Sequence, residues 1–330
     1  MFDAPKFHRR PVWLVSLMML VIVLMLVSPA AAQEATPEST AAAEILACPM
    51  SAPADFAPSL KVLTTFTILS DMASNIACGY LNIESITKIG AEIHGYEPTP
   101  SDVAKAQDAD LVVYNGLGLE RWFEKFMTNV QDVTSINASD GVDLIPIAEG
   151  DYIDKPNPHA WMSPKNAHMY VNNMLAAFIA LDPEHEAEYT ANAAAYSAQL
   201  DAVDTFLREN LAAVPVEQRF LVSCEGAFSY LTRDYELQEL YMWPINADQT
   251  GTPKQIAKVI DNVQENAVPA VFCESTVNND PMLAVSQQTG ARFGGVMYVD
   301  SITDPDGEAP TYLKLLERDA QTLVTGLLGQ

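Results

Sequence analysis

Short apolar runs alternate with longer amphipathic stretches from about residue 60 to the C-terminus. Continuous apolar runs bounded by polar residues are typical of buried strands, whereas apolar residues that recur every three or four positions are typical of helices. Regular alternation of the two predicts βαβ units, and therefore an α/β fold with mostly parallel sheets. The predicted strands cover residues 61–66, 83–89, 111–114 and 144–147 in the first half, and 220–224, 237–242, 270–273 and 293–298 in the second.

A long helical tract without strands, residues 164–213, separates the two halves. Because proline suits a first helical turn and disrupts an interior, the sequence Leu181-Asp182-Pro183 predicts one helix ending near Ala180 and another from Pro183 to Leu211. A helix of that length is suited to act as a rigid strut. The other predicted helices cover residues 68–77, 101–106, 119–130, 227–234, 253–265, 281–288 and 312–328.

Each half is long enough to bury a core of its own. We therefore predict two α/β lobes, residues 60–182 and 214–330, joined by a linking helix at residues 183–213. In open α/β sheets, ligands bind beyond the carboxyl ends of the strands. The cleft between the lobes is thus the expected place for a functional site.

The N-terminus has the order of a secretory signal peptide: basic residues up to Arg10, an apolar core at residues 12–27, and small residues at 30–32. The apolar core is shorter than the roughly 20 residues of a spanning helix, which favours a cleaved signal at residues 1–32 over an uncleaved membrane anchor. Residues 33–59 are rich in Ala, Pro, Glu, Ser and Thr, and predict a flexible spacer. We expect an exported, periplasmic or extracellular protein.

Four cysteines in an exported chain predict disulfides, and the absence of a Cys-x-x-Cys pair disfavours a zinc finger. Of three connectivities we prefer Cys48 with Cys78, which flank the first strand and helix, and Cys224 with Cys273, which end apolar strands. Two alternatives remain open. Cys48 ends a sequence that resembles a lipoprotein processing box and could carry a lipid, and Cys224 could be a metal ligand.

Acidic residues outnumber basic ones by 43 to 18, giving a net charge of −25. Such a chain repels nucleic acid and anionic membrane surfaces, which excludes nucleic-acid binding. The same acidity keeps an exported protein soluble, and it also concentrates divalent cations near the surface.

Four residues with metal-ligand chemistry, His94, His159, Glu225 and Asp300, each follow a predicted strand, two in each half. Any one of them has a simpler explanation, since a loop histidine is usually solvated and Asp300 could cap a turn at Ser301. A carboxylate after a strongly apolar strand, such as Glu225, needs a partner or a cation. Four such residues at four strand ends predict one shared metal site. Glu274 is the first substitute if one ligand is misassigned, followed by Glu97 and Asp102, whereas His8, His168 and His185 are not candidates.

Two imidazoles and two carboxylates form a mixed nitrogen and oxygen site. Carboxylate oxygen suits hard ions such as Mn²⁺, although the Irving-Williams order gives Zn²⁺ the higher raw affinity. A carboxylate-rich shell can exceed four-coordination, which favours Mn²⁺ or Fe²⁺ over a tetrahedral structural Zn²⁺.

From about Val62 to the C-terminus, the chain resembles the cluster 9 family of solute-binding proteins for metal ABC transporters. The resemblance implies that His94, His159, Glu225 and Asp300 are the ligands, that the partner is a membrane permease, and that the protein is not an enzyme. Glutamate in third place accompanies manganese in that family, and histidine accompanies zinc. The sequences that carry the likeness are residues 93–102 (IHGYEPTPSD), 109–116 (ADLVVYNG), 158–162 (PHAWM), 225–231 (EGAFSYL) and 273–275 (CES).

Two departures from the family pattern bear on metal preference. The usual Asp-Pro before the first histidine is Glu92-Ile93 here, and the usual Asp-Pro before the second is Asn157-Pro158. Both changes alter the groups that can hydrogen-bond the imidazoles. A zinc-specific uptake protein of the same family is therefore the main alternative.

Proteins of other classes fit the sequence less well. A secreted metal-dependent hydrolase needs an open coordination position and a general base, and the sequence has no His-Glu-x-x-His, Gly-x-Ser-x-Gly or Walker motif. Gly116-Leu117-Gly118 lacks the third glycine of a dinucleotide-binding loop and is explained by a turn. An adhesin that uses metal only for stability stays open. We expect a monomer.

Overall fold

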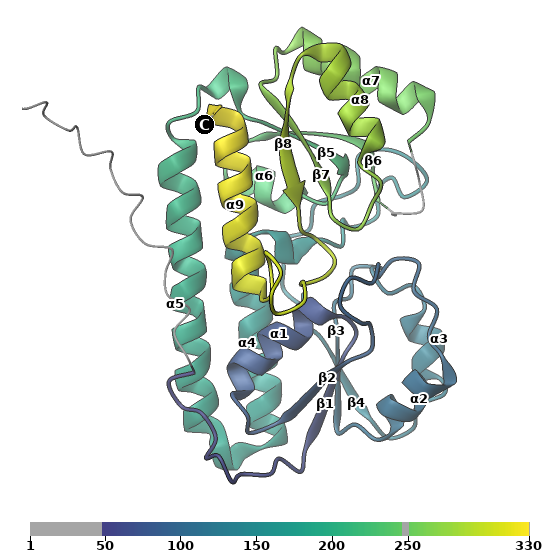
Figure 1. Ribbon diagram of the computed structural model, residues 1–330. Coiled ribbons are helices and arrows are strands. Elements are labelled where there is room, and N and C mark those ends of the chain that lie inside the picture. Colours follow the sequence, from purple (N-terminus) through teal and green to yellow (C-terminus); the bar gives the residue numbers. More distant parts are fainter. Residues whose placement is uncertain (1–47, 246–250, 330) are drawn as a thin grey trace, which may run out of the picture. The chain divides into compact units, whose positions relative to one another are not determined.

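The computed structural model describes residues 48–245 and 251–329 (Figure 1). These residues belong to one compact unit, and it has the predicted α/β architecture, with every named strand pair parallel. The predicted signal peptide and residues 33–47 of the predicted spacer lie outside the described residues. In the described part of the chain, no helix has both the length and the apolar character needed to cross a membrane.

The first lobe is built on a four-stranded sheet of order β2-β1-β3-β4. Alternate residues of its strands pack into different clusters: Val62 and Val113 on one face, Leu63 and Val112 on the other. Both faces are therefore covered, as a parallel sheet requires. The elements of this lobe are β1 (Lys61–Thr64), α1 (Thr67–Ala77), β2 (Asn82–Ser85), α2 (Pro100–Gln107), β3 (Leu111–Tyr114), α3 (Phe123–Met127) and β4 (Thr134–Asn137).

The prediction of a strand at residues 144–147 was wrong, because the fourth strand is β4, which begins ten residues earlier. Pro146 has no N–H to donate to a ladder, and it forms only an isolated bridge with Pro156. β4 escaped prediction because it is an edge strand with the polar sequence Thr-Ser-Ile-Asn, and its first two residues are exposed. The predictions for 83–89 and 119–130 were also too long, since β2 ends at Ser85 and α3 has five residues.

The second lobe contains two parallel strand pairs, β5 with β6 and β7 with β8. β5 lies against β7, and the disulfide Cys224–Cys273 joins their ends. The elements are β5 (Phe220–Glu225), α6 (Ser229–Asp234), β6 (Gln238–Trp243), α7 (Pro253–Glu265), β7 (Ala270–Glu274), α8 (Asp280–Thr289), β8 (Arg292–Met297) and α9 (Tyr312–Leu328).

A pair of long helices runs between the lobes in sequence. α4 (Pro164–Leu181) ends where the proline predicted a break, and a 3-10 turn at Pro183–His185 precedes α5 (Glu186–Leu211). α5 is thus 26 residues long, about 39 Å at the helical rise per residue. Because α5 packs against α4, α1 and α9 (Figure 1), a single rigid element contacts helices of both lobes.

The second disulfide, Cys48–Cys78, confirms the preferred cysteine pairing. It also occupies the sulfur of Cys48, which excludes a lipid on that thiol while the disulfide is formed. Residues 48–59 were predicted to belong to the spacer, but here they are held to the fold. The Met50 N–H donates to Asn192 Oδ1 at 2.9 Å, and the Phe56 ring lies 5.3 Å from that of Tyr80.

We predict that replacing both cysteines of the Cys224–Cys273 bridge with alanine lowers the free energy of unfolding by about 2–4 kcal/mol, because the open loop gains conformational entropy in the unfolded state. Urea denaturation of the metal-free protein measures the effect. The Cys48→Ala/Cys78→Ala pair, which opens a shorter loop, is the matched comparison and should cost no more. An unchanged denaturation midpoint for both pairs would contradict the prediction.

Candidate metal site

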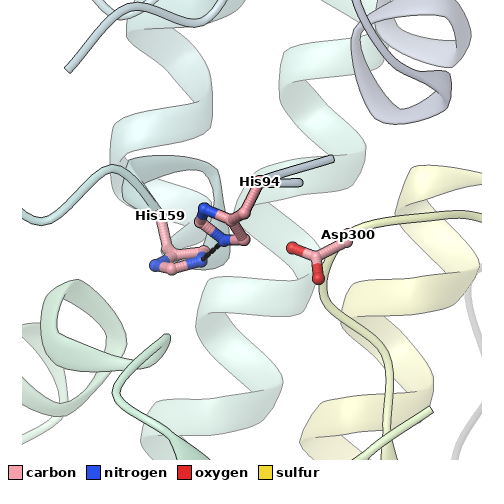
Figure 2. A group of neighbouring side chains, drawn as sticks. All are labelled: His94, His159 and Asp300. Carbon is pink, nitrogen blue, oxygen red and sulfur yellow. Dashed lines mark hydrogen bonds between the residues drawn. The ribbon is translucent and has the colours of Figure 1, made fainter. Parts of the chain in front are cut away.

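The four side chains singled out in the sequence converge and are buried. His94, His159 and Asp300 offer ligand atoms that all lie within 4.8 Å of one another (Figure 2). Glu225 joins them, with Oε1 3.5 Å from His94 Nε2 and 3.9 Å from His159 Nε2. None of the four is more than 5% exposed. The predicted convergence of two residues from each lobe is therefore confirmed.

The two carboxylates lie where the sequence placed them. Glu225 is the last residue of β5, and Asp300 follows β8 after Tyr298 and Val299. The carboxyl ends of parallel strands thus deliver both groups. Glu225 stands directly after Cys224, so the disulfide to β7 restrains the end of the strand that carries it.

The two histidines lie in loops rather than directly at strand ends. His94 is in the connection between β2 and α2, where the Glu92 carboxylate accepts hydrogen bonds from the backbone N–H groups of His94 and Gly95, at 2.5 and 2.7 Å. His159 begins the 3-10 turn Ala160–Met162. The expectation that it follows a strand ending at Ile147 was wrong, because the chain between β4 and this turn is irregular.

The two imidazoles point at the same place, with their Nε2 atoms 3.0 Å apart (Figure 2). Burial lowers the pKa of His94 to about 3, and the nearby charge of Arg121 acts in the same direction. Burial, followed by the charge of His94, holds the pKa of His159 well below its ordinary value. Both rings are therefore neutral at physiological pH, the form in which imidazole binds metals.

The pKa of Asp300 is shifted in the opposite direction to the pKa values of the two histidines. Burial, reinforced by the charge of Glu92, raises the pKa of Asp300 to about 7, against a lowering hydrogen bond from Thr276. Thr276 Oγ1 donates to Oδ2 at 3.2 Å, whereas Oδ1 has no hydrogen-bond partner among the described residues. A buried carboxylate oxygen in this state is stabilised by a cation. Two neutral imidazoles and two carboxylates together suit a divalent ion.

The alternatives to this ligand set do not reach it. Cys224 is bonded to Cys273, so its sulfur cannot bind a metal as a thiolate. Glu274 lies beside that disulfide and accepts a hydrogen bond from the Glu225 N–H at 3.2 Å. This bond restrains the backbone of Glu225. Burial raises the pKa of Glu274 to about 8. Glu97 is exposed, and Asp102 accepts hydrogen bonds from Tyr96 and Thr99.

A buried network that positions His159 was not assigned a role from the sequence. The Glu120 carboxylate accepts from Thr65 Oγ1 at 2.6 Å and from the backbone N–H of Asn115 at 2.7 Å. Asn115 Nδ2 in turn donates to the carbonyl of Pro158, the residue before His159, at 3.0 Å. Gly116 closes this turn with φ +77°, a conformation that favours glycine. The signal in the sequence was Glu120, which follows β3 and the Asn115-Gly116 turn by a few residues.

Three hydrogen bonds connect the residues on either side of Asp300 to the first lobe. Trp161 Nε1 donates to the carbonyl of Val299, next to Asp300, at 3.0 Å. On the other side of Asp300, Ser301 Oγ accepts from the Gly90 N–H at 2.7 Å and lies 3.1 Å from Thr67 Oγ1. These bonds hold the two halves of the site together.

Comparison with known proteins places the chain in a family. Residues 62–326 match the model of the family described as "Zinc-uptake complex component A periplasmic", and the chain belongs to that family. It is 51% identical to the iron-binding protein YfeA of Yersinia pestis over 274 residues, which is 83% of this chain and 88% of that protein. It is 37% identical to the manganese-binding lipoprotein MntA of Halalkalibacterium halodurans over 268 residues, 81% of this chain and 88% of that one.

Solved structures agree with this assignment. The Mn-bound periplasmic metal binding protein of Candidatus Liberibacter asiaticus is similar with a TM-score of 0.76 and 37% identity, over 82% of this chain and all of that one. The periplasmic zinc binding protein TroA of Treponema pallidum is similar with a TM-score of 0.73 and 25% identity, over 81% of this chain and 99% of that one. The chain thus has the two-lobed fold of these periplasmic metal-binding proteins. It belongs with substrate-binding proteins of metal ABC transporters, to two of which it is 34% identical. It is therefore not an enzyme, which removes the hydrolase alternative.

We predict that the metal-free protein loses stability as the pH rises from 6.5 to 8. In this window the folded state holds protons on Asp300 and Glu274, with pKa values of about 7 and 8, while the unfolded carboxyls are ionised. Stability that depends on such raised pKa values declines as the pH rises through them. The two histidines offset only part of this loss. Their rings are already neutral in the folded state, whereas unfolded imidazoles, with a pKa of about 6.5, lose their remaining protons just above pH 6.5.

Urea denaturation of chelator-treated protein at pH 6.5 and 8 tests this sign. Asp300→Asn should reduce the difference between the two pH values, whereas Asp261→Asn, at an exposed position of α7, should leave it unchanged. Equal or greater stability at pH 8 would show that the carboxyls are not held in the protonated form.

Proposed function

We propose that this chain is the extracytoplasmic binding component of a metal ABC transporter, and that His94, His159, Glu225 and Asp300 bind the metal ion that it carries to a membrane permease. The observation that supports this most is the meeting of two neutral imidazoles with two buried carboxylates in one enclosed place. A divalent cation stabilises two buried carboxylates and two imidazole lone pairs more than a proton or a water molecule does. The names of the relatives, which bind iron, manganese and zinc, support a transition metal as cargo.

We infer that Mn²⁺ is the preferred cargo, with Fe²⁺ the second candidate. Each carboxylate can contribute one or two oxygens, so the four residues can supply four to six ligand atoms, and Mn²⁺ accepts the higher numbers better than tetrahedral Zn²⁺ does. Fe²⁺ is favoured by a separate observation, the 51% identity to a protein named iron-binding. At equilibrium Zn²⁺ still binds such a site strongly, so supply and geometry decide which ion is carried.

The location and partner follow from the N-terminal pattern and the family. A signal peptide at residues 1–32 would export the chain, and several relatives are named as lipoproteins of ABC transporters. We propose a monomer that acts outside the cytoplasmic membrane, with lobes at residues 60–182 and 214–330 and a linking helix at 183–213. The disulfide at Cys48 favours association with the membrane through the permease rather than through a lipid on that residue.

We predict that His94→Ala and Glu225→Gln each lower Mn²⁺ affinity at least 100-fold, because the first removes a ligand nitrogen and the second removes one of the two negative charges that balance the cation. Calorimetry on chelator-treated protein measures the affinity. His168→Ala is the matched control, since His168 is also paired with a carboxylate, Asp201 at 3.0 Å, but belongs to no ligand cluster in the described residues. Wild-type affinity in both ligand variants would exclude the assigned site.

We also predict that Zn²⁺ displaces bound Mn²⁺ at equilibrium, in accordance with the Irving-Williams order, while cells that express the protein with its permease accumulate Mn²⁺ or Fe²⁺. Competition titrations under anaerobic conditions and elemental analysis of the cells measure the two quantities. Accumulation of zinc alone would favour the zinc-specific uptake protein instead.

A further inference from the structure

The side chain of Asn157 is buried, with 2% exposed, and it forms hydrogen bonds with groups of both lobes. Its Oδ1 accepts two hydrogen bonds from His159, one from the backbone N–H at 3.0 Å and one from ring Nδ1 at 2.9 Å. Its Nδ2 donates to the carbonyl of Gly226 at 2.6 Å and to Ser229 Oγ at 3.1 Å. Gly226 follows Glu225, so one amide contacts a ligand histidine and the segment that carries a ligand carboxylate.

The orientation of this amide is determined by two backbone groups. A backbone N–H can only donate, so the His159 N–H requires Oδ1 on its side, and a carbonyl can only accept, so Gly226 requires Nδ2 on the other. Ser229 agrees with this orientation. Its hydroxyl donates to Glu239 Oε2 at 2.6 Å, which leaves an oxygen lone pair to accept from Asn157.

The tautomer of His159 then follows. Because Oδ1 of Asn157 is an acceptor only, Nδ1 of His159 carries the hydrogen, and Nε2 presents its lone pair to the site. The neighbouring His94 Nε2, 3.0 Å away, must then be the donor in the metal-free protein. His159 is thus ready to bind a metal as it stands, whereas His94 has to turn its ring or move its hydrogen to Nδ1.

We propose that Asn157 is a positioning residue that holds His159 in the Nδ1–H tautomer and ties it to the Glu225 segment, so that ligands from both lobes are aligned before the metal arrives. The proposal rests on the proposed function, because it assumes that His159 and Glu225 bind the cargo. The Trp161 and Ser301 bonds also join the lobes, but neither donates to nor accepts from a ligand imidazole. Asn157 does both tasks with one group.

The first experiment removes the amide with little change in size. Asn157→Leu should lower Mn²⁺ affinity about 10–100-fold, the usual effect of losing a partner of a metal-binding histidine. It should also abolish the Nδ1–H signature of His159 in ¹⁵N-correlated NMR spectra of the metal-free protein. The space for leucine exists, because Asn157, Ser229 and Glu239 line a cavity of about 620 Å³. All proteins are expressed from the full chain with its own N-terminus.

Asn192→Leu is the matched control. Asn192 is also a buried bridging amide, 1% exposed, and it donates to the carbonyl of Met50 at 3.0 Å and to that of Ile76 at 3.3 Å, away from the ligands. It should leave both the affinity and the tautomer unchanged. If Asn157→Leu keeps the wild-type affinity and the Nδ1–H signature, the proposal is wrong.

The second experiment separates the two ends of the amide. Asn157→Asp keeps an acceptor for His159 but loses the donor to Gly226, so the tautomer should be retained while Mn²⁺ dissociates about 10-fold faster in stopped-flow measurements with a chelator. Dissociation at the wild-type rate would exclude the link to the Glu225 segment, and this variant decides the question alone if Asn157→Leu does not fold. A wild-type protein that fails to bind Mn²⁺ would instead refute the proposed function, and the tautomer of the metal-free protein would still test the role of Asn157.

Discussion

The structure depends on one electrostatic constraint, the burial of two carboxylates against two neutral imidazoles. Glu225 and Asp300 are essentially inaccessible to water, and burying ionised carboxylates without compensation is costly. In the metal-free protein, burial raises the pKa of Asp300, and the charge of Glu92 adds to this effect. A divalent cation compensates both carboxylates at once. The site is therefore least favourable when it is empty and fully ionised, and this is the physical basis for the proposed capture of a metal ion.

The rest of the fold keeps these groups together against that cost. The Cys224–Cys273 disulfide and the Glu274 carboxylate restrain the end of β5. Trp161 and Ser301 connect the residues on either side of Asp300 to the first lobe, and α5 packs against helices of both lobes. Asn157 joins His159 to Gly226. Such a frame limits how far the four side chains can move apart, so that a bound cation would relieve the charge more readily than a rearrangement.

Much of this was predictable from the sequence, because the relevant signals are local. Apolar runs before Glu225 and Asp300 located β5 and β8, and Pro183 located the end of α4. The preferred disulfide pairing was correct because both cysteines of each pair flank neighbouring elements. The convergence of His94, His159, Glu225 and Asp300 was predictable because four residues with metal-ligand chemistry follow predicted strands.

The errors occurred where tertiary contacts overrule local pattern. β4 is a polar edge strand stabilised by pairing with β3, so its sequence gave no apolar signal, while the apolar residues at 144–147 include a proline and form no ladder. The roles of Glu120 and Asn157 depend on hydrogen bonds to segments distant in sequence. The hydrophobic periodicity of a sequence does not indicate such contacts. For the same reason, the departure at Asn157 could be noticed in the sequence, but its bridging geometry could not.

A crystal structure of the Mn²⁺-loaded protein with anomalous scattering data collected at the manganese edge tests the central claim most directly. We expect a single buried anomalous peak about 2.0–2.3 Å from Nε2 of His94 and His159 and from carboxylate oxygens of Glu225 and Asp300, with five or six ligand atoms. A peak elsewhere on the molecule, or one that lacks the carboxylates, would contradict it.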